Sequence, residues 1–449
     1  MHTVKRFRLA IFSIYCSVAV LLDSLQRGYQ FWWKYPISTR IALSRAAAGD
    51  ADLGQFILPG LRKIRGFSST LQWWHGAWVG QVPFWRPLTS YLFWFEYKIF
   101  PYRYDYWYDV TVVSHLIFCA ILVLFVAKLS GRLSSGLLTV LVFSGASQLS
   151  PIGASWYSFD LIGTGRHPPS SVALDLWKNQ PEIWSSIFVV GALALLLYKK
   201  WGLSLVSACT AIAFKENGWL TFPLALLILW GTGNITKTPK YFYLAALCCF
   251  CVMMLIRLNC GRDVLFGYHY GHNTAWVHRY ILAAMRPYPA AFYGRDISQP
   301  LLATGVFAAW KLYKIRPLYG WLMLIVGLGM AIGAGMYVEH TDAITASVIL
   351  FTLPDNLESA VAGLLWLLGF DILWNGKTPR LMILSLVGSV LVSTALIALA
   401  AQVQVHVLYL AFAFRSILFA LTMITVWDRL SIRLPFLCNT IATDPVGCS

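Results

Sequence analysis

Long apolar stretches, separated by short polar turns, repeat along most of the chain. About twelve of them have the length and hydrophobicity of helices that cross a bilayer, for which about 20 apolar residues are needed. The expected spans lie at about 8–24, 110–128, 134–150, 183–198, 202–214, 218–232, 241–256, 300–315, 319–337, 349–370, 380–400 and 407–427. The pattern predicts an all-α, polytopic membrane protein.

The composition supports this class and excludes a water-soluble protein. Hydrophobic residues make up 58% of the 449 residues and charged residues only 12%, whereas soluble domains carry about 25% charged residues. The first apolar stretch follows "KRFR" without a small-residue cleavage site, so we expect an uncleaved first span. The nine cysteines show no paired spacing, which predicts neither a disulfide framework nor a zinc site.

Basic residues alternate between the ends of the expected helices and so indicate the orientation of the chain. Short cytoplasmic loops collect lysine and arginine. Sixteen such residues fall at alternate ends: Lys5, Arg6, Arg8, Lys128, Arg132, Lys199, Lys200, Lys237, Lys240, Lys311, Lys314, Arg316, Lys377, Arg380, Arg429 and Arg433. The opposing short loops, "VEHTDAI" and "QVQVH", contain none. Both termini are therefore expected on the cytoplasmic side of a bacterial inner membrane or an ER-like membrane.

Three long loops, 25–109, 151–182 and 257–299, then face away from the cytoplasm, and they are rich in basic and aromatic residues. Attraction to anionic lipid headgroups explains such a surface, and so does a site for a phosphate-bearing ligand. Within the first loop, segments 51–64 and 87–100 are too short to span the bilayer. We expect them to lie as helices in the membrane interface.

Acidic residues of the outer loops are candidates for acid–base chemistry. Asp50 and Asp52 lie in "GDADLGQF", just before a predicted interfacial helix. A carboxylate there can act as a general base on a hydroxyl or can cap the helix. Glu182 follows Pro181 at the membrane edge. It can help to close a site with Asp50, or it can stabilise the first turn of the next span through the helix dipole.

Basic residues at helix ends are candidates for phosphate binding. Arg86 precedes Pro87, and proline suits the first position of a helix. The planar Arg86 guanidinium can bind a phosphate or can snorkel to the interface. In "FKENG", Lys215 and Glu216 fall on the outer side, against the charge pattern of the short loops. Lys215 can bind a lipid-linked phosphate at the bilayer surface, or the two residues can form a pair that satisfies only itself.

Four segments, in this order, resemble one known family. They are "FWRPLTSYLFWFEYKIF", "DYWYDVTVVSHLIFCAILVLFVAKL", "RHPPSSVALDLWKNQPEIWSSIFVVGALALLLY" and "AFKENGWLTFPLALLIL". From about residue 80 to about residue 230 the chain resembles the membrane half of the tetratricopeptide-repeat-containing protein O-mannosyltransferase-like proteins and their bacterial relatives. The positions that match the short motifs of this group are Arg86, Pro87, Leu88, His115, His167, Pro168, Glu182, Lys215 and Glu216.

The resemblance implies the architecture and activity of GT-C glycosyltransferases. Such enzymes take a sugar from a polyprenyl-phosphate carrier on the non-cytoplasmic face and transfer it, with inversion, to a hydroxyl that an acidic residue of the first outer loop activates. Asp50 or Asp52 would be that base, and Glu182 would orient the base or the acceptor. The residues expected around the carrier phosphate are Arg86, His167, Lys215, Glu216, Arg279 and Arg286.

The resemblance also implies a domain organisation and a set of partners. A conserved-type GT-C transmembrane module would cover 1–256, a variable transmembrane module 257–428 and a cytoplasmic tail 429–449. The expected partners are the lipid bilayer, a polyprenyl-phosphate-linked sugar and an acceptor protein, glycan or lipid, with no nucleic acid. No cofactor is required if arginines neutralise the leaving phosphate, and a divalent metal is the alternative.

Other functions stay open on the sequence. Asp50 and Asp52 are separated by Ala51 and follow the first span by about 26 residues, whereas the family usually places an acidic pair closer to that span. A catalytically inactive GT-C-like assembly protein would show the same departure. A multi-span transporter or lipid flippase is the main rival, because that class also has many spans. Against it, the chain has no internal repeat, and only Arg415 is clearly a mid-span charge.

Overall fold

The computed structural model describes residues 10–22, 36–39, 57–76, 78–79, 84–101, 103–144, 180–260, 298–341, 364–365, 367–399 and 409–433. Within these ranges every regular element is a helix, which confirms the all-α prediction for this part of the chain. The principal elements are α3 (Leu58–Arg62), η3 (Phe67–Trp74), α4 (Pro87–Ile99), α5 (Tyr104–Ser130), α6 (Leu133–Ser144), α8 (Gln180–Leu197), α9 (Trp201–Phe214), η7 (Glu216–Leu220), α10 (Thr221–Gly231), α11 (Lys240–Cys260), α13 (Ser298–Tyr313), α14 (Pro317–Thr341), α16 (Arg380–Leu399) and α17 (Tyr409–Arg433).

Four described helices are long and apolar enough to cross a membrane. They are Asp109–Ser130 in α5, Gln180–Leu197, Lys240–Asn259 in α11 and Tyr409–Leu430 in α17. Shorter apolar helices occupy Ala10–Leu22, Leu133–Ser144, Trp201–Phe214, Pro317–Gly329 and Arg380–Thr394. Each expected span contains a described helix, except that most of 349–370 lies outside the described residues. The helices α3, η3 and α4 lie between the first two expected spans. The four long apolar helices are compatible with a membrane protein, and the total of twelve spans stays a prediction.

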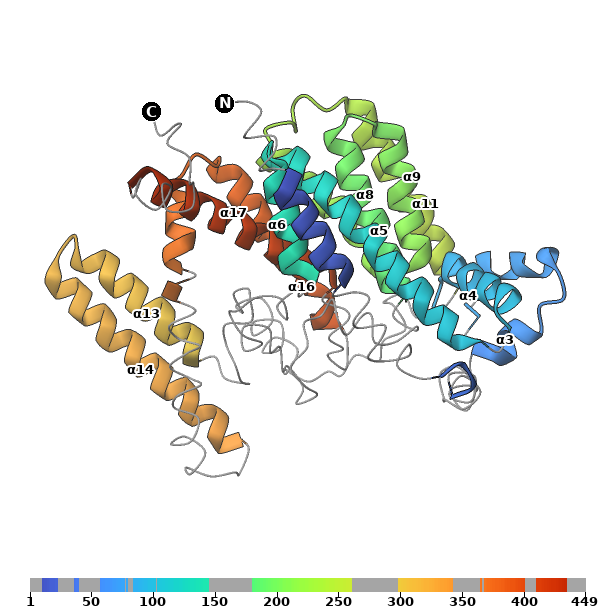
Figure 1. The fold of residues 1–449 in the computed structure, drawn as a ribbon, viewed down its shortest axis with the longest axis horizontal. Helices are drawn as coiled ribbons and strands as arrows, with labels where there is room; N and C mark the ends of the chain where they lie inside the picture. The colour runs from blue at the N-terminus through green and yellow to red at the C-terminus, as the bar shows by residue number, and fades with distance from the viewer. Residues whose placement is uncertain are drawn as a thin grey trace.

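The main bundle is built around one large apolar core, to which α5, α6, α8, α10, α16 and α17 all contribute (Figure 1). At its centre the rings of Phe118, Phe143 and Tyr409 have centroids 4.9 to 5.2 Å apart, a favourable distance for aromatic pairs. On the outside, α11 leaves Leu244 64% exposed and Leu255 60% exposed. An exposed apolar helix face of this kind suits contact with lipid.

Hydroxyl groups join α8 and α9 into a hairpin of fixed register. Ser185 of α8 donates a hydrogen bond to the Ala211 carbonyl of α9 at 3.0 Å. In the other direction, Ser204 of α9 donates to the Ala192 carbonyl of α8 at 2.9 Å. Small polar residues allow helices in an apolar medium to approach closely and to satisfy their hydroxyl groups. The first turn of α8 is thereby held beside the last turn of α9.

The short helix α4 lies at one end of this bundle (Figure 1). It begins with a proline and has Arg86 as its N-cap residue, as the sequence predicted. One face of α4 packs in an aromatic cluster in which Phe93 stacks on Trp107 of α5 at a centroid distance of 5.8 Å. Thr89 Oγ1 donates to the carbonyl of Phe214, the last residue of α9, at 2.5 Å. This bond brings the start of α4, and with it Arg86, to the end of α9.

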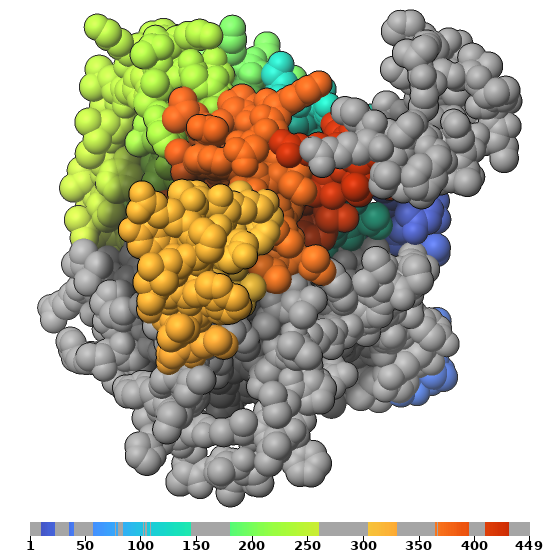
Figure 2. Space-filling model, turned by 90° about the vertical axis from the view of Figure 1, so that its left-hand side faces the viewer, coloured from blue at the N-terminus to red at the C-terminus, as the bar shows by residue number. Residues whose placement is uncertain are grey.

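The helices α13 and α14 form a hairpin on the outside of the molecule, next to the segment that leads into α16 (Figure 2). Their backbones approach closely at two glycines. A Cβ added to Gly305 would lie 2.7 Å from the Gly327 Cα, so no larger residue fits without a shift. Lys311 of α13 forms an ion pair with Asp371 at 2.5 Å, which attaches the hairpin to the helix over 367–374.

Candidate functional site

The "FKENG" segment forms a sharp connection between α9 and α10. The helix α9 ends at Phe214, whose ring stacks on Trp184 of α8 at 5.8 Å. Lys215 is fully extended, with φ −161° and ψ 162°, and Glu216 begins the 3-10 helix η7. Successive side chains of an extended backbone point to opposite sides. Lys215 and Glu216 therefore meet different partners.

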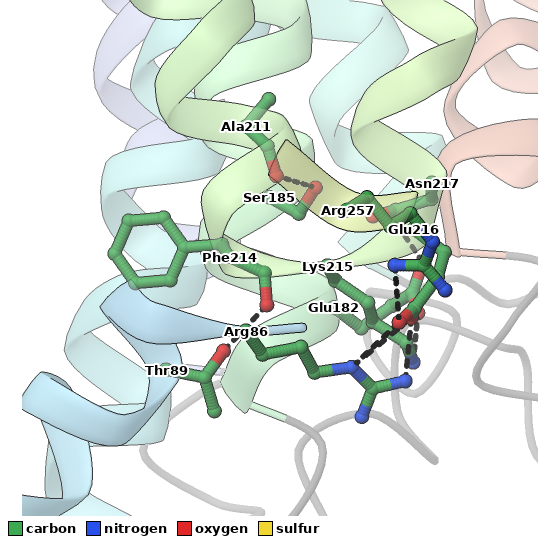
Figure 3. A network of polar contacts seen from close by, with 10 residues as sticks. All are labelled: Arg86, Thr89, Glu182, Ser185, Ala211, Phe214, Lys215, Glu216, Asn217 and Arg257. Carbon is green, nitrogen blue, oxygen red and sulfur yellow. Dashed lines mark hydrogen bonds and ion pairs between the residues drawn. The ribbon is translucent and has the colours of Figure 1, made fainter. Parts of the chain in front are cut away.

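The Glu216 carboxylate is held by two arginines from different helices. The Arg86 Nε donates to Oε1 and Oε2 at 3.1 and 3.0 Å, and the Arg86 Nη2 donates to Oε2 at 2.5 Å. Arg257, in the last turn of α11, has its Nη1 3.6 Å from Oε1. Both guanidinium groups are turned toward this carboxylate (Figure 3). Glu216 thus joins α4, η7 and α11 at one point.

The Glu182 carboxylate, in the first turn of α8, is held by the two residues on either side of Glu216. The Lys215 Nζ lies 2.5 Å from Oε2, and the Asn217 Nδ2 donates to Oε1 at 2.6 Å (Figure 3). One turn therefore takes part in two sets of contacts: Glu216 itself binds two arginines, and its two sequence neighbours bind Glu182. We call the following residues the ion-pair cluster: Arg86, Glu182, Lys215, Glu216, Asn217 and Arg257.

The ion-pair cluster is buried and carries more positive than negative charge. None of its six residues is more than 8% exposed. Burial on its own raises the pKa of Glu216, but the charges of Arg86, Arg257 and Lys215 outweigh burial and lower that pKa below its ordinary value. Of the described residues, the cluster gathers three cations and two carboxylates. Buried charges are stable only when they are paired, and each of these five charged groups has an ion-pair partner within the cluster.

Gly218 allows η7 to lie directly against α9. A Cβ added to Gly218 would lie 2.3 Å from the carbonyl carbon of Ala211 and 2.3 Å from the backbone nitrogen of Ile212. Backbone atoms cannot yield at such distances, so any side chain here would push η7 away from α9. Glu216 and Asn217 lie in the same turn and would move with it.

A second buried polar group lies in the core of the bundle. The His115 Nδ1 of α5 lies 2.8 Å from the Tyr409 hydroxyl of α17, and the Cys119 Sγ lies 3.5 Å from the His115 Nε2. His115, which matched a motif of the resembled family, is thus buried in the bundle core and in contact with Tyr409.

Comparisons with known proteins found no match to this chain. No family model matches the chain. No curated protein and no solved structure is significantly similar to it. The family resemblance stays a prediction that rests on the sequence motifs.

The structure brings together four of the residues that the sequence singled out. They are Arg86, Glu182, Lys215 and Glu216. The remaining predicted site residues lie outside the described residues: Asp50, Asp52, His167, Arg279 and Arg286. The predicted catalytic and phosphate-binding roles are untested for both groups. Among the described residues, no three His, Cys, Asp or Glu side chains are grouped as a metal site requires.

Two members of the cluster were not predicted from the sequence, and two of the alternatives that the sequence left open are wrong. Asn217 and Arg257 were not singled out, although a basic residue that ends an apolar span and a polar residue beside a Lys-Glu pair are both usable signals. The alternative in which Lys215 and Glu216 satisfy only each other is wrong, because each forms its ion pair with another helix. The alternative in which Arg86 snorkels is wrong as well, since its side chain is buried against Glu216.

Proposed function

We propose that the protein is a membrane glycosyltransferase of the GT-C type, which moves a sugar from a polyprenyl-phosphate carrier to an acceptor hydroxyl, with inversion, on the non-cytoplasmic face. The observation that supports this proposal most is the ion-pair cluster. Two guanidinium groups and one ammonium group are gathered at the ends of apolar helices. A lipid-linked phosphate would place its charge where such helices end and its hydrocarbon chain along their apolar sides.

The cluster suits the departure of a phosphate. When the bond between the sugar and the carrier phosphate breaks, negative charge grows on the phosphate oxygen, and cations fixed nearby lower the barrier. In this proposal Arg86, Lys215 and Arg257 supply the positive charge. Guanidinium groups are favoured for this task because their planar fork donates two parallel hydrogen bonds to a phosphate. Glu182 and Glu216 hold the cations in place before the carrier binds.

The acceptor side of the reaction is assigned to the first outer loop. Asp50 or Asp52 would take the proton from the acceptor hydroxyl while its oxygen attacks the anomeric carbon from the face opposite the phosphate. The new bond joins the acceptor oxygen to that carbon, the bond to phosphate breaks, and the proton stays on the aspartate. His167, Arg279 and Arg286 would complete the carrier site. The acceptor is a hydroxyl of a protein, a glycan or a lipid.

A transfer assay in detergent, with a polyprenyl-phosphate sugar as donor, tests this function. Joint replacement Asp50→Asn and Asp52→Asn is expected to abolish transfer, and Arg257→Gln is expected to lower kcat by about 10²-fold, as the loss of one charge-stabilising group does elsewhere. Lys200→Gln is the matched control, because Lys200 is exposed at the other end of α8. Full turnover in the aspartate variant would remove both acids from the mechanism.

The same variants separate the enzyme from its main rival. A flippase would move a fluorescent polyprenyl-phosphate lipid across proteoliposomes without forming a glycosidic product. Lipid movement that is unaffected by the aspartate replacements, with no transfer by the wild-type protein, would favour the transporter.

A further inference from the structure

A cavity of about 1060 Å³ lies at the opposite ends of the helices that carry the ion-pair cluster. The C-terminal ends of α5 and α10, the N-terminal ends of α6 and α16, and the last turns of α17 line it. The helix α5 runs from Trp107, near the cluster end, to Leu129 in the cavity wall, which corresponds to roughly 30 Å of helix. This length equals the thickness of a bilayer core. We call this space the far-end cavity.

The charged lining of the far-end cavity is mainly positive. Its lining contains three basic residues, Arg132, Lys377 and Arg429, and one acidic residue, Asp428. Arg132 forms an ion pair with Asp428 at 2.7 Å, and both side chains are about half exposed. The Arg429 Nη2 donates to the Asn375 carbonyl at 2.6 Å. Lys377 is exposed and has neither an ion pair nor a hydrogen bond within the part of the chain that the structure describes.

The wall of the far-end cavity has two chemical halves. Glycine-containing turns, 231–233 and 375–378, form a polar rim that carries Lys377. Helix flanks form an apolar half with these side chains: Leu129, Leu381, Met382, Leu421 and Ile424. Ser135 lines the same cavity and is fully buried, and its Oγ has no hydrogen-bond partner among the described residues. A cationic rim beside an apolar wall matches a ligand with an anionic head and a hydrocarbon tail, which a free phosphate ion lacks.

We propose that the far-end cavity binds an anionic phospholipid. Lys377 and Arg429 contact the headgroup phosphate through charge-assisted hydrogen bonds, and an acyl chain lies along the apolar half. The bound lipid connects α5, α10, α16 and α17, which meet at this cavity. This site is separate from the ion-pair cluster and does not depend on the proposed transfer reaction.

Native mass spectrometry of the full chain in detergent tests the proposal. The probes are phosphatidylglycerol, phosphatidylcholine and glycerophosphoglycerol, which is the headgroup without acyl chains. Wild-type protein is expected to retain phosphatidylglycerol in preference to the other two. Joint replacement Lys377→Gln and Arg429→Gln is expected to weaken phosphatidylglycerol binding at least about tenfold, because two charged donors are lost. Lys377→Arg, which keeps the charge, and Lys200→Gln, which removes a lysine outside the cavity, are expected to bind as wild type does.

Two results would overturn the proposal. One is equal phosphatidylglycerol binding by the double variant and by Lys200→Gln. The other is binding of glycerophosphoglycerol as tight as that of the lipid, because an apolar wall would then contribute nothing. If the double variant fails to fold, Lys377→Gln alone decides the question. Lys377 forms no ion pair or hydrogen bond with the described residues, so its replacement is not expected to affect folding. Arg257→Gln should leave phosphatidylglycerol binding unchanged, which distinguishes this site from the proposed carrier site.

Discussion

Arg86 joins two parts of the chain that are 130 residues apart in sequence. Its guanidinium binds Glu216 through Nε and Nη2, and its Cζ lies 4.2 Å from the centroid of the Phe84 ring and 5.4 Å from that of Trp78. A delocalised, planar cation interacts with aromatic faces and a carboxylate at the same time. A lysine at position 86 would keep the charge and lose the fork.

A double-mutant cycle on Arg86 and Glu216 tests the strength of this buried pair. Arg86→Met removes the bidentate partner of Glu216 and leaves it with Arg257, and Glu216→Leu takes the shared carboxylate from two buried arginines. Each single change is expected to lower the free energy of unfolding by about 3–5 kcal/mol. The double variant is expected to lose clearly less than the sum, measured by denaturant unfolding in mild detergent. The half-exposed pair Arg132–Asp428 serves as control, with an expected coupling of about 0–1 kcal/mol. Additive losses at Arg86 and Glu216 would contradict a coupled pair.

Glu96 of α4 provides a pH-dependent test of the packing around α4. Burial raises the pKa of Glu96 well above its usual value, and the neighbouring Gln180 side chain opposes only part of that rise. The folded state therefore holds a proton that the unfolded state releases, so stability falls as pH rises above the ordinary carboxylate range of about 4.3. Glu96→Gln is expected to melt higher than wild type at about pH 8 and to differ little at about pH 4. A Glu96→Gln variant that melts at a lower temperature than wild type at about pH 8 would contradict this account.

At the scale of the elements, the position of η7 is controlled by one glycine. Gly218→Ala is expected to lower the melting temperature and to weaken carrier binding, because the added methyl meets the backbone of α9. Gly202→Ala is the matched control, since a Cβ there meets nothing within 4 Å and alanine favours a helix by about 1 kcal/mol. Thermal melts of both variants provide the measurement. Equal behaviour would show that η7 does not need its close contact with α9.

The elements themselves followed from the sequence, whereas their pairing did not. Apolar length located α5, α8, α11 and α17, and the Arg86–Pro87 step located the start of α4. Hydrophobic periodicity contains no information on which helix ends meet. The meeting of Glu182 with Lys215 depends on the serine-fixed register of α8 against α9, and Arg257 reaches Glu216 only because α11 packs beside α9. Such contacts are tertiary and leave no periodic signal.

At the scale of the whole molecule, two charged sites lie at opposite ends of shared helices. The ion-pair cluster lies at the start of α8 and α10, and the far-end cavity lies at the end of α5 and α10. The basic residues of the second site were counted in the sequence only as signals of orientation. Their assembly into one cavity could not be predicted, because 132, 377 and 429 come from separate parts of the chain.

Cysteine labelling tests the expected orientation of these two ends. Ser68→Cys in η3 and Lys200→Cys in the turn between α8 and α9 place exposed thiols near opposite ends, in a background with Cys248 and Cys251 changed to serine. A membrane-impermeant maleimide is expected to label Ser68→Cys on intact cells and Lys200→Cys only after permeabilisation, because basic turns stay cytoplasmic. Labelling of both positions from one side would contradict the twelve-span topology.

The central claim is that the ion-pair cluster binds the phosphate of a lipid carrier, and photo-crosslinking locates that phosphate most directly. A polyprenyl phosphate with a diazirine beside its phosphate would be bound to the protein in nanodiscs, irradiated and mapped by peptide mass spectrometry. The account predicts adducts on the segments that supply the cluster, 84–90, 180–186, 214–220 and 253–259, and their loss with excess unlabelled carrier. Adducts confined to 129–135, 375–382 and 421–429, or spread evenly over the exposed face of α11, would contradict it.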